Sequence, residues 1–280
     1  MWIDLHTHSS VSDGTQRPAE VMRSAALAGL DVLALTDHDT TAGWQQAADA
    51  VAHTGVSLVR GTEISTKSEG VSVHLLSYLH DPQDEALRQF FDRTRASRSG
   101  RAQRMVERIA QDYPLTWDEV LDQVEDGATV GRPHLADALI ARGYVADRSA
   151  AFAHILSPAG PYFQPHWAPS TADAVVAVRA AGGVPVLAHP RSLTRGRVVS
   201  DHTIAQLAAV GLAGVEVDHP DHDDADRVDL RALVADLGLL ATGSSDYHGA
   251  GKPTGLGHCT TEPQVLDQIA AAGRIEILRP

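Results

Sequence analysis

The sequence predicts an α/β fold in which alternating strands and helices form a barrel, interrupted by an α-helical insertion. Short apolar runs alternate with helical patterns up to residue 80, and the same alternation resumes after residue 170. The stretch between them has helical patterns only. Repeated strand–helix units build parallel sheets, and about seven of them suffice for a closed or nearly closed barrel. We therefore divide the chain into a first barrel part (1–80), an α-helical insertion (81–170) and a second barrel part (171–280).

The first barrel part contains four predicted strands and two predicted helices. Apolar runs over 2–5, 31–35, 57–63 and 71–78 predict the strands, and helical patterns cover 17–28 and 41–53. Pro18 favours the start of the first helix, and Gly29 suits its C-terminal cap.

The second barrel part repeats one unit three times. Predicted helices over 172–181, 203–210 and 225–237 each end at a glycine, and each leads into an apolar run, at 184–188, 214–217 and 239–242. The insertion has helical patterns over 83–113, as one or two helices, and over 117–123, 133–141 and 148–156. With these elements, the predicted barrel has seven strands and an α-helical insertion.

Composition limits the chemistry. The 280 residues are 43% hydrophobic and 21% charged, typical of a compact globular protein. A formal net charge of −13 argues against binding long duplex DNA over the whole surface. Cys259 is the single cysteine, so neither an internal disulfide nor a zinc site of several thiolates can form. Any bound metal must use His, Asp and Glu.

Targeting features are absent from the sequence. No apolar run approaches the length of a membrane span, and the N-terminus lacks the pattern of a secretory signal peptide. We expect a cytoplasmic protein without membrane contact. The sequence does not indicate the oligomeric state.

Arginines are concentrated in the first insertion helix. Between residues 88 and 108 there are seven arginines and only two acidic residues, Asp92 and Glu107, which gives a local charge of +5. Two interpretations remain open: a solvated helix face, or a positive wall beside an anion site.

Histidines and carboxylates follow the predicted strands. His6 and His8 are two residues apart on one strand, so their side chains share a face, and Asp13 follows in the next loop. The remaining candidates lie in or just after later strands: Asp37, His38, Asp39, Glu63, His74, His189, Asp246 and His248. Because parallel strands of β/α folds open onto one face at their C-terminal ends, the pattern predicts a metal centre there.

These motifs resemble those of the polymerase-and-histidinol-phosphatase (PHP) superfamily of metal-dependent phosphoesterases. The resemblance is carried by His6-x-His8, Asp13, Thr36-Asp37-His38, Glu63, His74, Ala188-His189-Pro190 and Ser245-Asp246-Tyr247-His248. The insertion with Gly131-Arg132-Pro133-His134, and the segment 216–222, resemble more narrowly the bacterial branch that hydrolyses nucleoside 3′,5′-bisphosphates and trims RNA 5′ ends. Asp218 departs from that branch, where an aromatic residue is expected.

The resemblance implies a distorted (β/α)7-type barrel that holds two or three divalent ions. The implied ligands are His6, His8, Glu63 and Asp246 for one ion, Asp13, His38 and His248 for a second, and Glu63, His74 and His189 for a third. His134 could replace His189. Carboxylate and imidazole ligands suit Mn²⁺, Fe²⁺ or Zn²⁺ without choosing among them.

A further layer of residues is expected around the ions. Arg132 and His134 are predicted to bind phosphate and, with Asp13 and His38, to act in catalysis; Arg191, His219 and His222 are further substrate-binding candidates. Capping and surface salt bridges are the structural alternatives. Asp37 and Asp39 could orient ligands, and Asp39 could instead cap a helix.

The predicted function is metal-dependent hydrolysis of a small phosphorylated substrate, a nucleotide or short RNA. The alternatives are a phosphatase for a small metabolite such as histidinol phosphate, an amidohydrolase-type reaction at carbon, and a non-catalytic, metal-stabilised PHP module. All nine implied ligand positions are present, which favours an enzyme.

Overall fold

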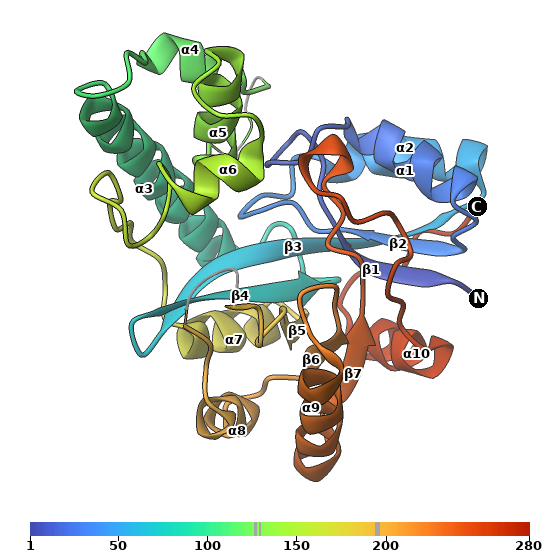
Figure 1. Cartoon of the computed structure of the whole chain (residues 1–280). Helices are drawn as coiled ribbons and strands as arrows, with labels where there is room; N and C mark the ends of the chain where they lie inside the picture. Colours follow the sequence, from blue (N-terminus) through green and yellow to red (C-terminus); the bar gives the residue numbers. More distant parts are fainter. Residues whose placement is uncertain (126–127, 129, 194–196) are drawn as a thin grey trace.

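The computed structural model describes residues 1–125, 128, 130–193 and 197–280 (Figure 1). In this part of the chain the strands form one seven-stranded sheet in sequence order. Its strands are β1 (Ile3–Thr7), β2 (Val32–Leu35), β3 (Ser57–Ser68), β4 (Val71–Tyr78), β5 (Val184–Leu187), β6 (Gly214–Asp218) and β7 (Leu240–Gly243). The predicted order of strands and helices is confirmed.

One strand departs from the predicted parallel arrangement. β4 runs antiparallel to both β3 and β5, whereas the other neighbouring pairs from β1 to β7 are parallel. The reason is the connection: Glu69 and Gly70 both have positive φ, 51° and 75°, and form a tight hairpin turn. A parallel pair would need a crossover of a dozen or more residues.

The sheet curves until its first and last strands approach each other. Thr7, the last residue of β1, forms an isolated parallel bridge with Tyr247, which follows β7, and the His8 backbone N–H donates to the Tyr247 carbonyl at 2.8 Å. The barrel is therefore nearly closed, as predicted, and its seam lies beside the strand that carries His6.

Helices cover the outside of the barrel. α1 (Pro18–Leu27) and α2 (Trp44–Thr54) pack beside β2 and β3, and α7 (Thr171–Ala180), α8 (Asp201–Ala209) and α9 (Asp224–Leu237) lie on the other side (Figure 1). A further helix, α10 (Pro263–Ala272), was not predicted, although Pro263 is a typical helix start. In the described part of the chain, no helix has both the length and the apolar character to span a membrane.

The insertion is a separate helical layer above one side of the barrel (Figure 1). Its helices are α3 (Glu85–Ile109), α4 (Trp117–Leu121), α5 (Arg132–Ala141) and α6 (Arg148–Ala153). They share a hydrophobic cluster of their own, which includes Met105, Val106 and Leu139. The pattern over 83–113 is thus one helix, and two of its arginines, Arg98 and Arg101, are buried.

Candidate metal centre

Glu63, on β3, lies at the centre of the predicted metal site and is fully buried. Its Oε2 lies 3.0 Å from His8 Nε2, 3.1 Å from His6 Nε2 and 3.2 Å from His38 Nδ1. No hydrogen-bond donor among the described residues satisfies this oxygen. Several imidazole nitrogens around one carboxylate oxygen, without hydrogen-bond geometry, form a donor set suited to a divalent cation.

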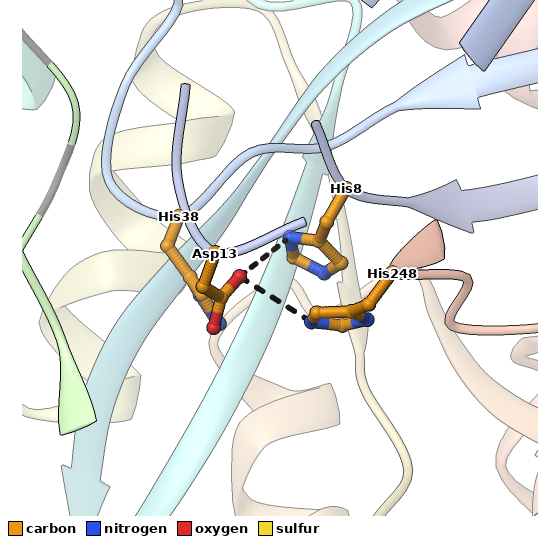
Figure 2. Close-up of side chains that lie close together, drawn as sticks. All are labelled: His8, Asp13, His38 and His248. Atoms are coloured by element: carbon orange, nitrogen blue, oxygen red, sulfur yellow. Dashed lines mark ion pairs between the residues drawn. The ribbon is translucent and has the colours of Figure 1, made fainter. Parts of the chain in front are cut away.

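Three groups of side chains have atoms placed to share an ion. The first is His6, His8, Glu63 and Asp246; the second is His8, Asp13, His38 and His248; the third is His38, Glu63 and His74. Figure 2 shows the second group, in which Asp13 points between His8 and His248. Asp13 Oδ1 lies 3.3 Å from His248 Nε2 and 3.7 Å from His8 Nδ1.

His189, in the loop after β5, approaches the same carboxylate. Its Nε2 lies 2.9 Å from Glu63 Oε1, and His74 Nδ1 lies 2.5 Å from that oxygen. His134 is buried at the start of α5, where its Nδ1 accepts a hydrogen bond from the Gly131 N–H at 3.1 Å. All nine implied ligands therefore converge, and His134 lies in the insertion beside them.

The electrostatics of the cluster favour ionised carboxylates. Burial alone would raise the pKa of Glu63, but His74, His38 and His6 outweigh burial and hold this pKa well below its usual value. Burial opposes ionisation of Asp13 in the same way, and His38 and His248 hold its pKa well below the usual range. The site thus presents charged oxygens to a cation.

Buried acceptors fix the orientation of the imidazole rings. Glu216, on β6, places Oε1 3.2 Å from His6 Nδ1, and its Oε2 accepts the His189 N–H at 2.8 Å. The His248 Nδ1–H donates to the Asp246 carbonyl at 2.8 Å. With a proton on each Nδ1, the Nε2 lone pairs of His6 and His248 point into the cluster.

The two oxygens of Asp246 have different neighbours. Oδ1 faces His6 and His8, at 3.5 Å and 3.4 Å, on the metal side of the carboxylate. Oδ2 lies 2.5 Å from Lys252 Nζ and 3.4 Å from His219 Nε2. Lys252 and His219 therefore hold the carboxylate with one oxygen directed at the cluster.

Backbone strain is concentrated at the strand ends. His189, Asp246 and Asp39 adopt positive φ values of 29°, 51° and 54°, which non-glycine residues rarely adopt. Such conformations cost about 1–3 kcal/mol each and are found where the surrounding structure requires them. Here they place side chains at the barrel mouth.

Asp37 supports the loop that carries Asp13. Its carboxylate accepts the Ser9 N–H at 2.8 Å and the hydroxyls of Ser9 and Ser12, each at 2.7 Å. Gly14 closes the same loop, because a Cβ there would lie 2.5 Å from the His8 carbonyl oxygen. Asp37 thus orients the loop rather than the ring of His38.

Asp39 joins the barrel to the insertion. Its carboxylate accepts the Ser65 N–H and hydroxyl, each at 2.8 Å, and Arg98 Nη1 at 3.0 Å. It caps no helix, since α2 begins at Trp44 with Gly43 as its N-cap. Arg98 lies on α3, so one buried ion pair connects the arginine-rich helix with the metal side of the barrel.

The predicted substrate residues occupy varied surroundings. Arg132 packs its guanidinium over Phe152 and Phe163 and donates to a backbone carbonyl. Arg191 forms an ion pair with Asp201. Both ring nitrogens of His222 are used, because Nδ1 donates to the Val217 carbonyl and Nε2 accepts a backbone N–H. His219, in contrast, contacts the proposed ligand Asp246.

Sequence reasoning missed Glu216 and Lys252 as parts of the centre. Glu216 is a buried acid on a predicted apolar strand, and that pattern alone is a usable indication of a functional carboxylate. Lys252 approaches Asp246 only through the turn after His248, which the sequence does not reveal.

The fold and this centre define a metal-dependent phosphoesterase, a hydrolase. A PHP domain model matches residues 4–126. The chain is also 34% identical, over 99% of its length and 98% of the relative, to a 3′,5′-nucleoside bisphosphate phosphatase from Chromobacterium violaceum. The chain belongs to the PHP family.

Other relatives carry different activities. The chain is 32% identical to a phosphoribosyl 1,2-cyclic phosphate 1,2-diphosphodiesterase from Eggerthella lenta, over 88% of this chain and 94% of that one. It is also 32% identical to a 5′-3′ exoribonuclease from Haemophilus influenzae, over 88% and 89%. A solved structure assigned as a metal-dependent phosphoesterase, from Bifidobacterium adolescentis, superposes with a TM-score of 0.95 at 44% identity, covering 97% and 96%.

Proposed function

We propose that this enzyme hydrolyses phosphate esters of nucleotides, namely nucleoside 3′,5′-bisphosphates and the 5′ ends of short RNA. The observation that carries the proposal is that a dense His and carboxylate centre lies beside an arginine-rich helix. Arg98 of that helix reaches Asp39 next to the metal ligands. Similarity to a bisphosphate phosphatase over nearly the whole chain supports this substrate class.

The proposed ligand sets resemble the three groups of side chains, but the second omits His8 and the third has His189 in place of His38. His6, His8, Glu63 and Asp246 would hold one ion, and Asp13, His38 and His248 a second. Glu63, His74 and His189 would hold a third. The 2.9 Å approach of His189 to Glu63 supports His189 over His134 as the third ligand.

When bound, divalent ions in such a cluster activate a water for attack on phosphorus and neutralise charge on the phosphoryl oxygens. The chain supplies the remaining groups. Asp13 Oδ2 lies 3.7 Å from His38 Nε2, and the negative charge of Asp13 also acts on His134 of α5, whose pKa it raises against the effect of burial. Because His134 Nδ1 accepts a hydrogen bond, its Nε2 carries the proton and can donate to a phosphate oxygen.

Arg132 and Arg191 are proposed as phosphate-binding residues, although both already have contacts within the protein. Their guanidinium groups contact Phe152 and Asp201, respectively, within the protein. Either arginine must therefore exchange a contact when substrate binds. His219 would act on substrate indirectly, by holding Asp246, and His222 would support the Arg191 loop through its hydrogen bond to the Arg191 N–H.

The proposed ions are Mn²⁺, Fe²⁺ or Zn²⁺, because the ligand set mixes imidazole with carboxylate. Metal analysis of the purified protein would identify the ion and its stoichiometry. Two or three equivalents are expected, and fewer than two would contradict the ligand sets.

A substrate panel tests the proposal. It would include a nucleoside 3′,5′-bisphosphate, a 5′-phosphorylated short RNA, a phosphoribosyl 1,2-cyclic phosphate, histidinol phosphate and an aryl phosphate. We expect the highest kcat/KM for the bisphosphate or the RNA. A higher value for the cyclic phosphate or for histidinol phosphate would overturn the substrate class. No hydrolysis with a fully loaded centre would favour a non-catalytic module.

A further inference from the structure

Arg101, on α3, is a buried cation without an acidic partner in the described part of the chain. It is 6% exposed, and its Nη1 donates to His166 Nδ1 at 3.1 Å. Its Nε is buried and has no hydrogen-bond partner among the described residues. A buried guanidinium normally pairs with a carboxylate, because an unpaired buried charge is strongly destabilising.

The residues around Arg101 add further positive charge to its surroundings. Burial and, to a smaller extent, the charges of Arg98, Arg132 and Arg104 together lower its pKa to about 9. Lys67, on β3, donates its Nζ to the His166 carbonyl. Burial and the nearby Arg101, Arg98 and Lys67 lower the pKa of His166 to about 2, so this ring is neutral. Since its Nδ1 accepts, its Nε2 is a hydrogen-bond donor.

The cluster of Lys67, Arg101 and His166 is connected to the metal centre by β3. Lys67 follows Glu63 by four residues on β3, which places the two Cα atoms about 13 Å apart along the strand. The charge of His74, a proposed metal ligand, also contributes to the lowered pKa of His166. Long lysine and arginine side chains can cover part of this separation, so a nucleotide can reach from one site to the other.

We propose that Lys67, Arg101 and His166 form a second phosphate subsite, which holds the phosphate that is not hydrolysed. The inference rests on the proposed function and specifies its substrate as a molecule with two phosphates. The three side chains offer hydrogen-bond donors and positive charge, the recognition chemistry of a phosphate dianion. A phosphate would also supply the negative charge that the surrounding protein does not provide to Arg101.

The test compares a nucleoside 3′,5′-bisphosphate with the two corresponding monophosphates, using metal-loaded protein. In Arg101→Met, we expect kcat/KM for the bisphosphate to fall roughly 10- to 150-fold, the effect of losing a charge-assisted hydrogen bond. For the monophosphate that is hydrolysed, we expect a change of less than about twofold. Lys67→Met, at a partly exposed position, should also lower kcat/KM for the bisphosphate relative to kcat/KM for the monophosphate. Arg101→Lys should recover part of the loss, because it restores the charge without the planar fork.

Thermal stability provides a readout that does not depend on turnover. Removal of an unpaired buried cation should leave the Tm of Arg101→Met equal to or above that of the wild type, whereas a structural arginine would lower it. Sulfate should raise the Tm of the wild type more than that of Arg101→Met or Lys67→Met. Arg95→Gln is the matched control, because Arg95 lies on the same helix and pairs with Asp92 at the surface.

Failure of the subsite and failure of the proposed function give different results. If wild-type protein hydrolyses no nucleotide but its stabilisation by sulfate requires Arg101 and Lys67, the proposed function is wrong and the anion site stands. If both variants keep the wild-type preference for the bisphosphate and the wild-type response to sulfate, the subsite is overturned. An equal loss on both substrates would assign Arg101 to the reacting phosphate and would also overturn it.

Discussion

Glu216 Oε1 lies 3.2 Å from His6 Nδ1, and both side chains are completely buried. This contact orients the ring of a proposed ligand from a neighbouring part of the barrel. The same carboxylate accepts the Ser244 hydroxyl and the His189 N–H, so one acid on β6 organises two ligand positions.

Glu216→Gln should weaken metal binding. The amide has the same shape but only one acceptor oxygen, so it cannot accept from both the His6 Nδ1–H and the His189 backbone N–H, as the carboxylate does. Loss of such an orienting residue typically costs 10- to 100-fold in metal affinity. Competition with a chelator would measure the change. Glu262→Gln, at an exposed helix cap without a side-chain hydrogen bond, is the control; unchanged metal affinity in Glu216→Gln would contradict the assigned role.

Asp246→Asn should have a larger effect, because it alters a proposed ligand directly. We expect metal affinity and kcat each to fall by more than about 100-fold, beyond the loss caused by an orienting residue. The variant also leaves the Lys252 ammonium without its anionic partner. Metal content and turnover would be measured on the same preparation, and full values of both would exclude Asp246 as a ligand.

Metal removal should abolish activity, and Mn²⁺ should restore it. Burial lowers the pKa of His8, but contacts with Asp246 and Glu63 outweigh burial and raise this pKa to about 9 in the metal-free protein. Protons therefore compete with ions at His8 below about pH 9, so metal affinity and activity should both fall as the pH decreases. A chelator-resistant enzyme with a flat rate between pH 5 and 8 would rule out this dependence.

Arg148 connects the insertion to the Asp13 loop. It pairs with Asp137 through two hydrogen bonds, at 2.6 Å and 2.7 Å, and donates to the Asp13 carbonyl at 3.0 Å. Arg148→Gln should lower stability by about 1–3 kcal/mol, because Asp137 loses its partner in a partly buried position. It should also lower kcat through the displaced Asp13. Urea unfolding and kinetics would test both, with the exposed Arg142→Gln as the control.

His80 should make the protein sensitive to acid independently of the metal centre. Burial between Trp44 and Phe91 lowers the pKa of His80 to about 4, so the folded state keeps this ring neutral while the unfolded chain binds a proton below about pH 6.5. Stability is thus lost as the pH falls from 6.5 towards 4. Between pH 7 and 5 the loss from His80 is about 2 kcal/mol.

His80→Leu should remove that pH-dependent part of the unfolding free energy. Urea unfolding of metal-free protein at pH 7 and pH 5 would measure it for the variant, the wild type and a control at the exposed His53. An identical difference between the two pH values in wild type and His80→Leu would show that His80 does not couple stability to pH.

Much of the architecture could be predicted because it depends on local patterns. Apolar runs and glycine-terminated helices located the strands and helices of the barrel within a few residues. The antiparallel β4 could not be derived from apolar content alone, since it depends on the Glu69-Gly70 turn. The last helix, α10, was not predicted, although Pro263 is a typical helix start.

For the candidate site, local sequence patterns were enough to identify the side chains that could bind metal. His, Asp and Glu at the ends of successive strands must meet, because strand direction and the closure of the barrel bring those ends together. The family and the class of reaction followed from the same residues. The position of a residue along a strand is a local property, and it can therefore be read from the sequence pattern alone.

The groups that support those ligands can be identified only in the folded protein. Glu216 reaches His6 across 210 positions of sequence, and Lys252 reaches Asp246 through a turn. The arginines of α3 all looked alike in the sequence, yet Arg98 is paired with Asp39 whereas Arg101 is buried among other cations. Burial and pairing depend on which distant elements pack together, and no periodicity along one helix contains that information.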